Sequence, residues 1–185
     1  GSGVDRSENT ATNLNPANYG VNDITNPTVF AQVFNGMVTA LTANGAKGVV
    51  ANVPYITDLA NFTTVPYNPV PLEIAKRTIN FTAGSNAVVI IDENLTNLEA
   101  LNPAFAGLKQ YRQATSADLL LLASSSFIGT TVGGNAQLIN GVTVPLGDEW
   151  VLTPQEQSAI KTATDAYNTT IAAVASSNPN IALVD

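Results

Sequence analysis

The chain has 185 residues, of which 45% are hydrophobic, so it is long enough to form one domain with a buried core. Its net charge is -7 with only 7 Lys and Arg residues, and it contains neither Cys nor His. These counts disfavour nucleic acid and anionic membrane surfaces as partners, and they exclude zinc sites built on Cys or His, thiol nucleophiles and triads with a His base within this chain.

The first 28 residues are rich in Asn, Thr, Ser, Pro and Gly and show no sustained period, which predicts a polar loop segment over residues 1–28. From residue 29 to residue 185 we predict a partial α/β domain. A helix is predicted after Asn26, with Asn26 as N-cap, Pro27 at the first helical position and a stop at Asn44-Gly45. Its apolar face recurs at steps of three and four residues and comprises Val29, Phe30, Val33, Phe34, Met37, Val38 and Leu41.

The next segments predict a strand, a long loop and a hairpin. "KGVVANVP" follows the helix after a short turn and is typical of a buried parallel strand. Residues 54–72, "PYITDLANFTTVPYNPVPL", carry four prolines and predict a long ordered loop. Residues 78–91, "TINFTAGSNAVVII", predict two strands joined around residues 83–86.

The last third of the chain predicts two strands, a further hairpin and a helix. "ADLLLLASSSF", residues 117–127, predicts a second buried strand, and "TVGGNAQLINGVTVPLGDEW" a Gly-rich hairpin. A helix is predicted to open at Thr153-Pro154-Gln155-Glu156, a capping-box pattern, and to end around residues 176–179. Its predicted buried face comprises Ile160, Ala163, Tyr167, Ile171 and Val174. "NIALVD" then begins a third strand, and this order predicts an α/β domain with a mainly parallel sheet that continues beyond the chain.

Several long phrases resemble the SGNH or GDSL-type hydrolases, in particular the large lipoprotein members of that family in Bacteroidetes. They are "NPTVFAQVFNGMVTALTANGAKGVVANVPYITDL", "TTVPYNP", "RQATSADLLLLASSSFIGT", "NGVTVPLGDEWVLTPQEQSAIKTATDAYNTTI" and "IALVD". The resemblance covers nearly all of residues 15–185. It implies a flavodoxin-like, three-layer α/β/α sandwich, a serine esterase or lipase activity on ester substrates, and a secreted or outer-membrane lipoprotein at the cell surface.

The catalytic blocks of that family are missing from this chain. It contains no Gly-Asp-Ser or Gly-Asn-Ser block, and it has no His for the late Asp-x-x-His block. We therefore interpret the chain as a middle-to-late section of such an enzyme, inactive alone, whose expected partners are the missing N- and C-terminal segments of the same protein. The resemblance implies no cofactor and no metal.

One short motif bears on the oxyanion site. "GVNDIT" contains the Gly-x-Asn-Asp pattern in which the family's Asn helps to hold the oxyanion, which makes Asn22 a candidate. In the family this block ends a buried apolar strand, because the strand holds the Asn amide rigidly. Here the polar "TNLNPANY" precedes it, so the favoured interpretation is a chance match in a loop, with Asn22 or Asp23 as a turn or cap residue.

Other candidates have a functional and a structural interpretation. Ser124, Ser125 and Ser126 would end a strand at a ligand-binding sheet edge, but strand-end hydrogen bonding is favoured over catalysis because no base is evident. The adjacent pairs Asp92-Glu93 and Asp148-Glu149 could serve glycoside hydrolysis or calcium binding, and solvated turn carboxylates are favoured.

Three aromatic residues of the proline-rich loop are further candidates. Tyr55, Phe62 and Tyr67 could line an acyl pocket or stack on a sugar, while pinning the loop to its own domain is the favoured alternative. A second hypothesis follows from these residues and the acidic, Lys-poor composition. It is a non-catalytic module at a bacterial surface that binds a glycan or a protein.

Overall fold

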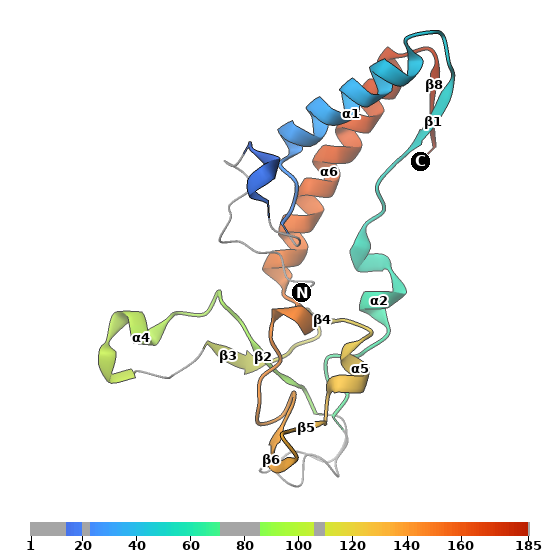
Figure 1. The fold of residues 1–185 in the computed structure, drawn as a ribbon. Coiled ribbons are helices and arrows are strands. Elements are labelled where there is room, and N and C mark those ends of the chain that lie inside the picture. Colours follow the sequence, from blue (N-terminus) through green and yellow to red (C-terminus); the bar gives the residue numbers. More distant parts are fainter. Residues whose placement is uncertain (1–13, 20–22, 71–85, 106–109, 185) are drawn as a thin grey trace. The chain divides into compact units, whose positions relative to one another are not determined.

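The computed structural model describes residues 14–19, 23–70, 86–105 and 110–184. They form a mixed α/β structure that divides into two compact units (Figure 1). The central unit holds the described residues from Thr57 to Pro154, and the terminal unit holds those up to Ile56 and from Gln155 onward. The predicted mixture of helices and strands is therefore confirmed at the level of class.

Helix α1 (Pro27–Thr42) of the terminal unit begins at the predicted residue. The side chain of Asn26 accepts a hydrogen bond from the backbone N–H of Thr28 at 2.8 Å. Pro27 occupies the first helical position, where a missing N–H breaks no helical hydrogen bond. Beyond the helix, Gly45 has a φ of 77°, which glycine adopts without a Cβ penalty. The predicted cap and stop are confirmed.

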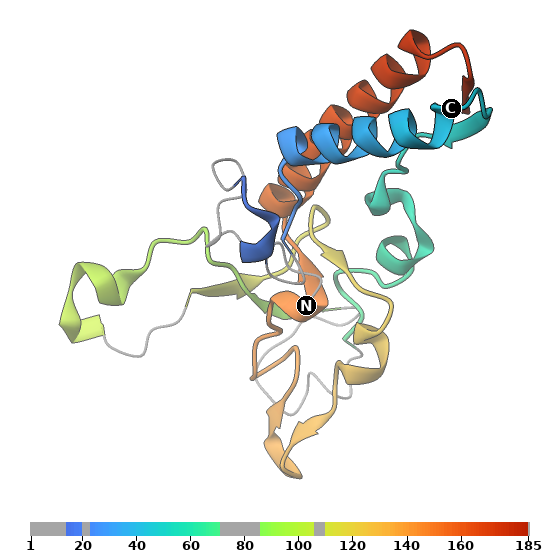
Figure 2. The same ribbon diagram turned by 45° about the horizontal axis from the view of Figure 1, so that its top comes forward.

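Helix α6 (Pro154–Ser177) lies beside α1 in both ribbon views (Figures 1 and 2). Near the start of α1, the ring centroids of Phe30 and Tyr167 are 4.5 Å apart. At the other end, Asn178 Nδ2 donates to Thr42 Oγ1 at 3.0 Å. The two helices therefore run in the same direction. The predicted face of α6 is partly confirmed, since the side chains of Ala163, Ile171 and Val174 are buried.

Strands β1 (Gly48–Ala51) and β8 (Ile181–Val184) are parallel, and each follows a helix. Gly48 pairs with Ile181, and a Cβ on Gly48 would lie 3.1 Å from the Ile181 side chain. Both strands are at the predicted positions, but the predicted burial of β1 is wrong. Gly48 and Val50 are half-buried, whereas Val49 is 69% exposed, so only alternate residues are covered in the described structure. An apolar run in the sequence does not show whether one face of the strand or both faces are covered. The sequence therefore could not distinguish a fully buried strand from a half-covered one.

The strand pairs of the central unit are antiparallel, in contrast to β1 and β8. They are β2 (Val89–Ile91) with β3 (Tyr111–Gln113), β4 (Leu119–Leu120) with β7 (Val151–Leu152), and β5 (Thr131–Val132) with β6 (Asn135–Ile139). The prediction of a mainly parallel sheet is therefore wrong for the described residues, whose pairing is only partly parallel. Between β5 and β6 the connection is too tight for the crossover that a parallel pair requires.

The Gly-rich hairpin is confirmed at β5 and β6. Gly133 and Gly134 between these strands have φ values of 58° and 75°, as the two central residues of a tight hairpin turn require. The other predicted hairpin, around residues 83–86, falls mostly in residues 71–85, outside the described residues. Its second strand contains β2.

The predicted strand over residues 117–127 is confirmed only at β4. The chain then turns into the short helix α5 (Ser124–Phe127). Each of the three Ser hydroxyls donates to the carbonyl oxygen three residues earlier. Such hydrogen bonds from Ser hydroxyls to nearby backbone carbonyls offer the chain an alternative to the pairing of an extended strand. The Ser triplet therefore forms a helical turn and does not end a strand.

Short helical segments complete the described structure. They are η1 (Pro16–Asn18), η2 (Ile56–Asp58), α2 (Ala60–Thr63), α4 (Leu98–Leu101), η3 (Pro103–Phe105) and η4 (Asp148–Trp150). The core of the central unit consists of aliphatic side chains from its strands and loops, among them Val65, Val70, Ile90, Leu120 and Leu146. Phe127 and Trp150 stack at its margin with ring centroids 4.4 Å apart.

Candidate functional site

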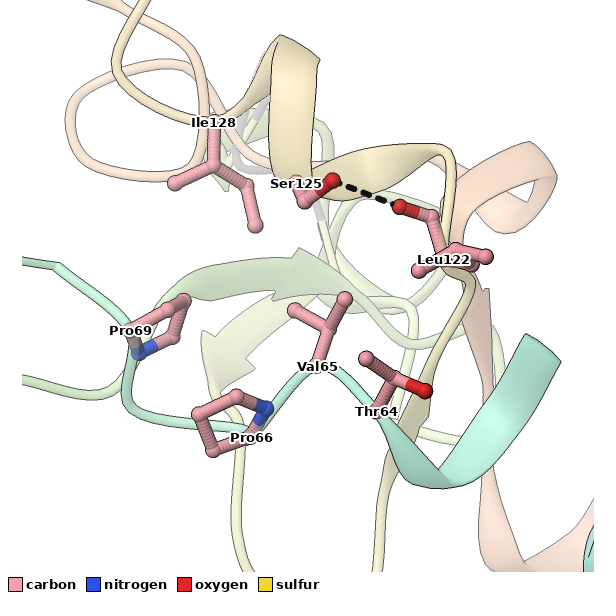
Figure 3. A pocket seen from close by; sticks show the side chains of 7 residues that line it. All are labelled: Thr64, Val65, Pro66, Pro69, Leu122, Ser125 and Ile128. Atoms are coloured by element: carbon pink, nitrogen blue, oxygen red, sulfur yellow. Dashed lines mark hydrogen bonds between the residues drawn. The ribbon is translucent and has the colours of Figure 1, made fainter. Parts of the chain in front are cut away.

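A pocket of about 440 Å³ lies in the central unit between the proline-rich loop and the segment that contains α5 (Figure 3). This volume falls in the range of small-molecule sites. The loop contributes four lining residues and the α5 segment three; they are Thr64, Val65, Pro66, Pro69, Leu122, Ser125 and Ile128. Carbon atoms dominate this lining, and none of the seven side chains is charged.

The loop wall of the pocket is held at both ends. Val65 pairs with Leu120 as an antiparallel bridge, and both side chains are buried. Val70 exchanges backbone hydrogen bonds with Asn86 at 3.3 and 3.2 Å. Between these anchors, Pro66 and Pro69 restrict the backbone further because their rings fix φ. The loop therefore presents a preformed apolar wall.

The opposite wall is set by the turn that leads into α5. The backbone N–H of Leu122 donates to the carbonyl oxygen of Asn61 at 2.7 Å, which ties this turn to α2. Ser124 is fully buried, and its hydroxyl donates to the Leu121 carbonyl oxygen at 2.7 Å. Ser125 lines the pocket and donates to the Leu122 carbonyl oxygen at 2.7 Å, as the dashed line in Figure 3 shows. These bonds give the serines a structural role and leave their hydroxyls without the base that a nucleophile needs.

The chemistry of the lining suits an uncharged, apolar ligand. Its two hydroxyls belong to Thr64 and Ser125, and Thr64 Oγ1 donates to the Ala60 carbonyl oxygen at 2.6 Å. Burying aliphatic surface against such a wall is favourable by roughly 25 cal/mol per Å². A charged group would lose its hydration with no opposite charge in the lining to replace it.

The aromatic candidates do not line this pocket. Phe62 is 6% exposed within α2, and Tyr67 packs against the core of the central unit. Tyr55 belongs to the terminal unit, where its hydroxyl donates to Asp165 Oδ1 at 2.5 Å. The Lys161 ammonium lies 5.2 Å from the Tyr55 ring centroid. The three aromatics thus contact different parts of the chain, and each is held by its own unit. The oxyanion candidate Asn22 lies outside the described residues.

One wall of the pocket lies in the predicted proline-rich loop, and Ser125 on the other wall is among the candidates named from the sequence, whereas the other lining residues are not. Thr64 and Ser125 meet only through tertiary structure, and neither carries a recognisable motif. The one available signal was the cluster of prolines, since rigid backbone between apolar residues favours a preformed wall.

The interpretation of Asp92 as a solvated turn carboxylate is wrong. Asp92 is 4% exposed, and its Oδ2 lies 2.6 Å from Arg112 Nε. Burial by itself would raise the pKa of the Asp92 carboxyl, but hydrogen bonds from Arg112 and Asn94 outweigh it and hold that pKa below its ordinary value. Arg112 also binds Asp118, which is equally buried. Glu93, beside Asp92, is exposed, so the adjacent pair does not act as a unit.

This ion cluster is not arranged as a ligand site. The Asp118 carboxylate accepts hydrogen bonds from Arg112 and from the backbone N–H and hydroxyl of Thr115. Burial by itself would raise the pKa of the Asp118 carboxyl. The hydrogen bonds from Arg112 and Thr115 outweigh burial, so this pKa lies below its ordinary value. Within the described part of the chain, no group of three or more acidic residues is placed to hold a metal ion.

A second, smaller pocket of about 230 Å³ lies in the terminal unit. Its lining is almost entirely apolar and combines the segment before α1 with one face of that helix, including Val33 and Met37. These two side chains are 55% and 53% exposed. The predicted apolar face of α1 is therefore only partly covered in the described structure, where Val29 and Val38 are buried and Phe30 and Phe34 are half-buried.

Comparison with known proteins adds no relative. No protein-family model matches the chain, and neither the curated proteins nor the solved structures yield a match. Among the described residues, no helix is long and apolar enough to cross a membrane. The pocket of the central unit therefore has to be interpreted from its own geometry.

Proposed function

We propose that this chain is part of a serine acylhydrolase of the SGNH or GDSL type, acting on ester substrates, and that the pocket of the central unit holds the aliphatic part of the substrate. The observation that carries the proposal is the preformed, uncharged pocket between the proline-rich loop and α5. The resemblance of the long sequence phrases to that family supports it.

A flavodoxin-like sandwich fold, which the resemblance implies, is part of the same proposal. Two helix-then-strand units, α1 with β1 and α6 with β8, run in the same direction and pair in parallel. This is the connection used in doubly wound α/β sheets. We place these units in a flavodoxin-like sandwich whose other strands come from N- and C-terminal segments of the same protein, at the cell surface as a secreted or lipid-anchored enzyme.

The chain itself would contribute binding and not bond cleavage. In such an enzyme a Ser attacks the ester carbonyl with His as base, and amide groups stabilise the oxyanion. This chain has no His, so those steps require residues from outside it. Its pocket would fix the aliphatic group, which reduces the freedom of the ester relative to the attacking Ser.

Two measurements test the proposal. The 185-residue chain alone should not hydrolyse short-chain p-nitrophenyl esters, and turnover sensitive to a serine-hydrolase inhibitor would contradict the missing triad. The same chain should bind a non-hydrolysable alkyl amide probe, detected by chemical-shift changes at Val65 and Ile128. Thr64→Phe should fill the pocket and abolish these changes. Thr63→Phe is the matched control, because Thr63 is exposed and does not line the pocket.

A second candidate is the glycan-binding surface module. It rests on Tyr55, which is 37% exposed and lies beside an ammonium and a carboxylate on α6. Aromatic faces next to charged groups are common in sugar contacts. Binding on a glycan panel that Tyr55→Ala abolishes would support this candidate, whereas an absence of binding across the panel would count against it.

A further inference from the structure

We infer that the pocket of the central unit selects uncharged aliphatic ligands that carry a hydroxyl or an amide N–H, and that it rejects carboxylates of the same length. This inference deepens the proposed function, because it concerns the same pocket and names the class of ligand. It follows from counting the hydrogen-bond donors and acceptors of the lining.

The lining is poor in backbone donors. Pro66 and Pro69 have no N–H at all. The backbone N–H groups of Leu122, Ser125 and Ile128 donate to the carbonyl oxygens of Asn61, Leu122 and Ser124, respectively. Five of the seven lining residues therefore have no backbone donor to offer a ligand.

The side chains of the lining add no donor either. A hydroxyl has one proton and two lone pairs. The protons of Thr64 and Ser125 are both used, at 2.6 Å to Ala60 and at 2.7 Å to Leu122. Of the two, Ser125 presents its oxygen at the pocket wall, while the Thr64 oxygen turns away from Ser125 (Figure 3). Among the side chains of the lining, a ligand would therefore meet an acceptor at Ser125 and aliphatic groups elsewhere.

The hydrogen-bonding groups of the lining should distinguish between ligands of equal length that differ in their polar end group. A ligand hydroxyl or amide N–H can donate to Ser125 Oγ and replace a hydrogen bond to water. A carboxylate only accepts, so it would lose hydration and find no side-chain donor and no cation in the lining. The cost of an unpaired charge exceeds that of an unpaired neutral group, and it should weaken carboxylate binding by at least about tenfold.

The test is a pair of NMR titrations of the 185-residue chain at neutral pH, with hexan-1-ol and with sodium hexanoate. We expect hexan-1-ol to shift the signals of Val65, Ser125 and Ile128, and hexanoate to do so at least about tenfold more weakly. The acidic net charge of the chain would also repel hexanoate, but such long-range repulsion is screened by salt. The preference should therefore persist when salt is raised to roughly 0.5 M, where the Debye length falls well below 10 Å.

Two variants make the test specific. Ser125→Arg places a cation and donors at the wall and should invert the preference in favour of hexanoate. Ser126→Arg adds the same charge one position away, on an exposed residue outside the lining, and should leave the preference unchanged.

The outcomes separate this inference from the proposed function. Equal binding of the two probes, or an equal response of both arginine variants, would overturn the selectivity and leave an acyl pocket in place. Binding of neither probe would overturn both. A preference for the alcohol that persists in salt and inverts only in Ser125→Arg supports the inference.

Discussion

Arg112 and Asp118 form a two-pronged ion pair in which Nη1 lies 2.7 Å from Oδ2 and Nη2 lies 2.7 Å from Oδ1. The Asp118 side chain is fully buried, and the Arg112 side chain is 24% exposed. The third guanidinium nitrogen, Nε, binds Asp92. One side chain on β3 therefore pairs with two buried carboxylates, at the end of β2 and in the turn before β4.

Replacing Arg112 should destabilise the central unit strongly. Arg112→Met leaves two buried carboxylates without their cation, and loss of one partner of a buried pair costs about 3 kcal/mol or more. We expect a loss of about 2 to 4 kcal/mol in the free energy of unfolding, since Arg112 is partly exposed. Urea unfolding followed by the fluorescence of Trp150, the single Trp of the chain, reports on this unit.

Lys161→Met is the matched control for this substitution. It removes the same charge from the ion pair of Lys161 with Asp165. Both side chains of this pair are exposed, that of Lys161 by 63% and that of Asp165 by 46%. Exposed pairs contribute little to stability. The Trp150 transition should not move measurably, and equal effects of the two variants would contradict a special role for the buried cluster.

The same cluster predicts a dependence of stability on pH. The pKa values of Asp92 and Asp118 are lowered from an ordinary value of 3.8, so as pH falls the unfolded chain binds protons before the folded chain does. Their stabilising contribution is complete above that ordinary value and is lost as pH falls through the lowered values. The free energy of unfolding should therefore decrease below about pH 4.

The Arg112→Met variant should respond to acid in the opposite sense. Without the cation, burial dominates and raises the pKa of both carboxyls, so that protonation relieves an unpaired buried charge. The difference in stability between variant and parent should narrow as pH falls. Parallel pH profiles of the two proteins would show that the cation does not set these pKa values.

Two glycines with positive φ should differ in their tolerance of a side chain. Gly133 has a φ of 58° and open space around its Cβ position, whereas Gly141 has a φ of 78° and a Cβ there would lie 3.3 Å from the Val88 side chain. Gly133→Ala should cost about 1 kcal/mol for backbone strain alone, and Gly141→Ala more, because Val88 must also shift. The Trp150 transition measures both.

Asn at these two positions separates strain from crowding. Asn visits the left-handed region more easily than Ala does. Gly133→Asn should therefore lose less stability than Gly133→Ala, whereas Gly141→Asn should lose no less than Gly141→Ala. If Asn rescued both positions equally, crowding against Val88 would not contribute.

Local chemistry explains which elements the sequence predicted correctly. A helix start such as Asn26-Pro27 or a turn such as Gly133-Gly134 is specified by adjacent residues, so it can be identified without the fold. The prediction of a strand over residues 117–127 is wrong beyond β4, because the apolar run extends on both sides of the residue where β4 ends. The hydrogen bonds of its serines decide where the strand stops.

Contacts between distant residues could not be predicted in the same way. Asp92 and Arg112 are 20 residues apart, and no sequence motif around either residue identifies the other as its partner. The prediction from sequence is therefore that Asp92 is exposed to solvent, as most carboxylates are. The pocket also depends on contacts between distant residues, since the α5 segment meets the proline-rich loop through the pairing of Val65 with Leu120 and the hydrogen bond from Leu122 to Asn61.

The N-cap of α1 gives the last prediction. Asn26 is 3% exposed, and its side chain accepts from the N–H of Thr28, one of the helical donors that have no partner within the helix. Asn26→Ala should lower the stability of the terminal unit by about 1 kcal/mol, whereas Asn26→Ser, which keeps an acceptor, should lose much less. Far-UV circular dichroism during urea unfolding follows α1 and α6.

Asn15→Ala is the matched control for the cap. Asn15 makes the same kind of bond, to the N–H of Ala17 at 3.1 Å, but it caps a single exposed turn. Its loss should leave the helical transition nearly unchanged, because η1 is a single turn of three residues, none of them buried. If Asn26→Ser lost as much stability as Asn26→Ala, the contribution of Asn26 would come from packing of its buried amide and not from capping.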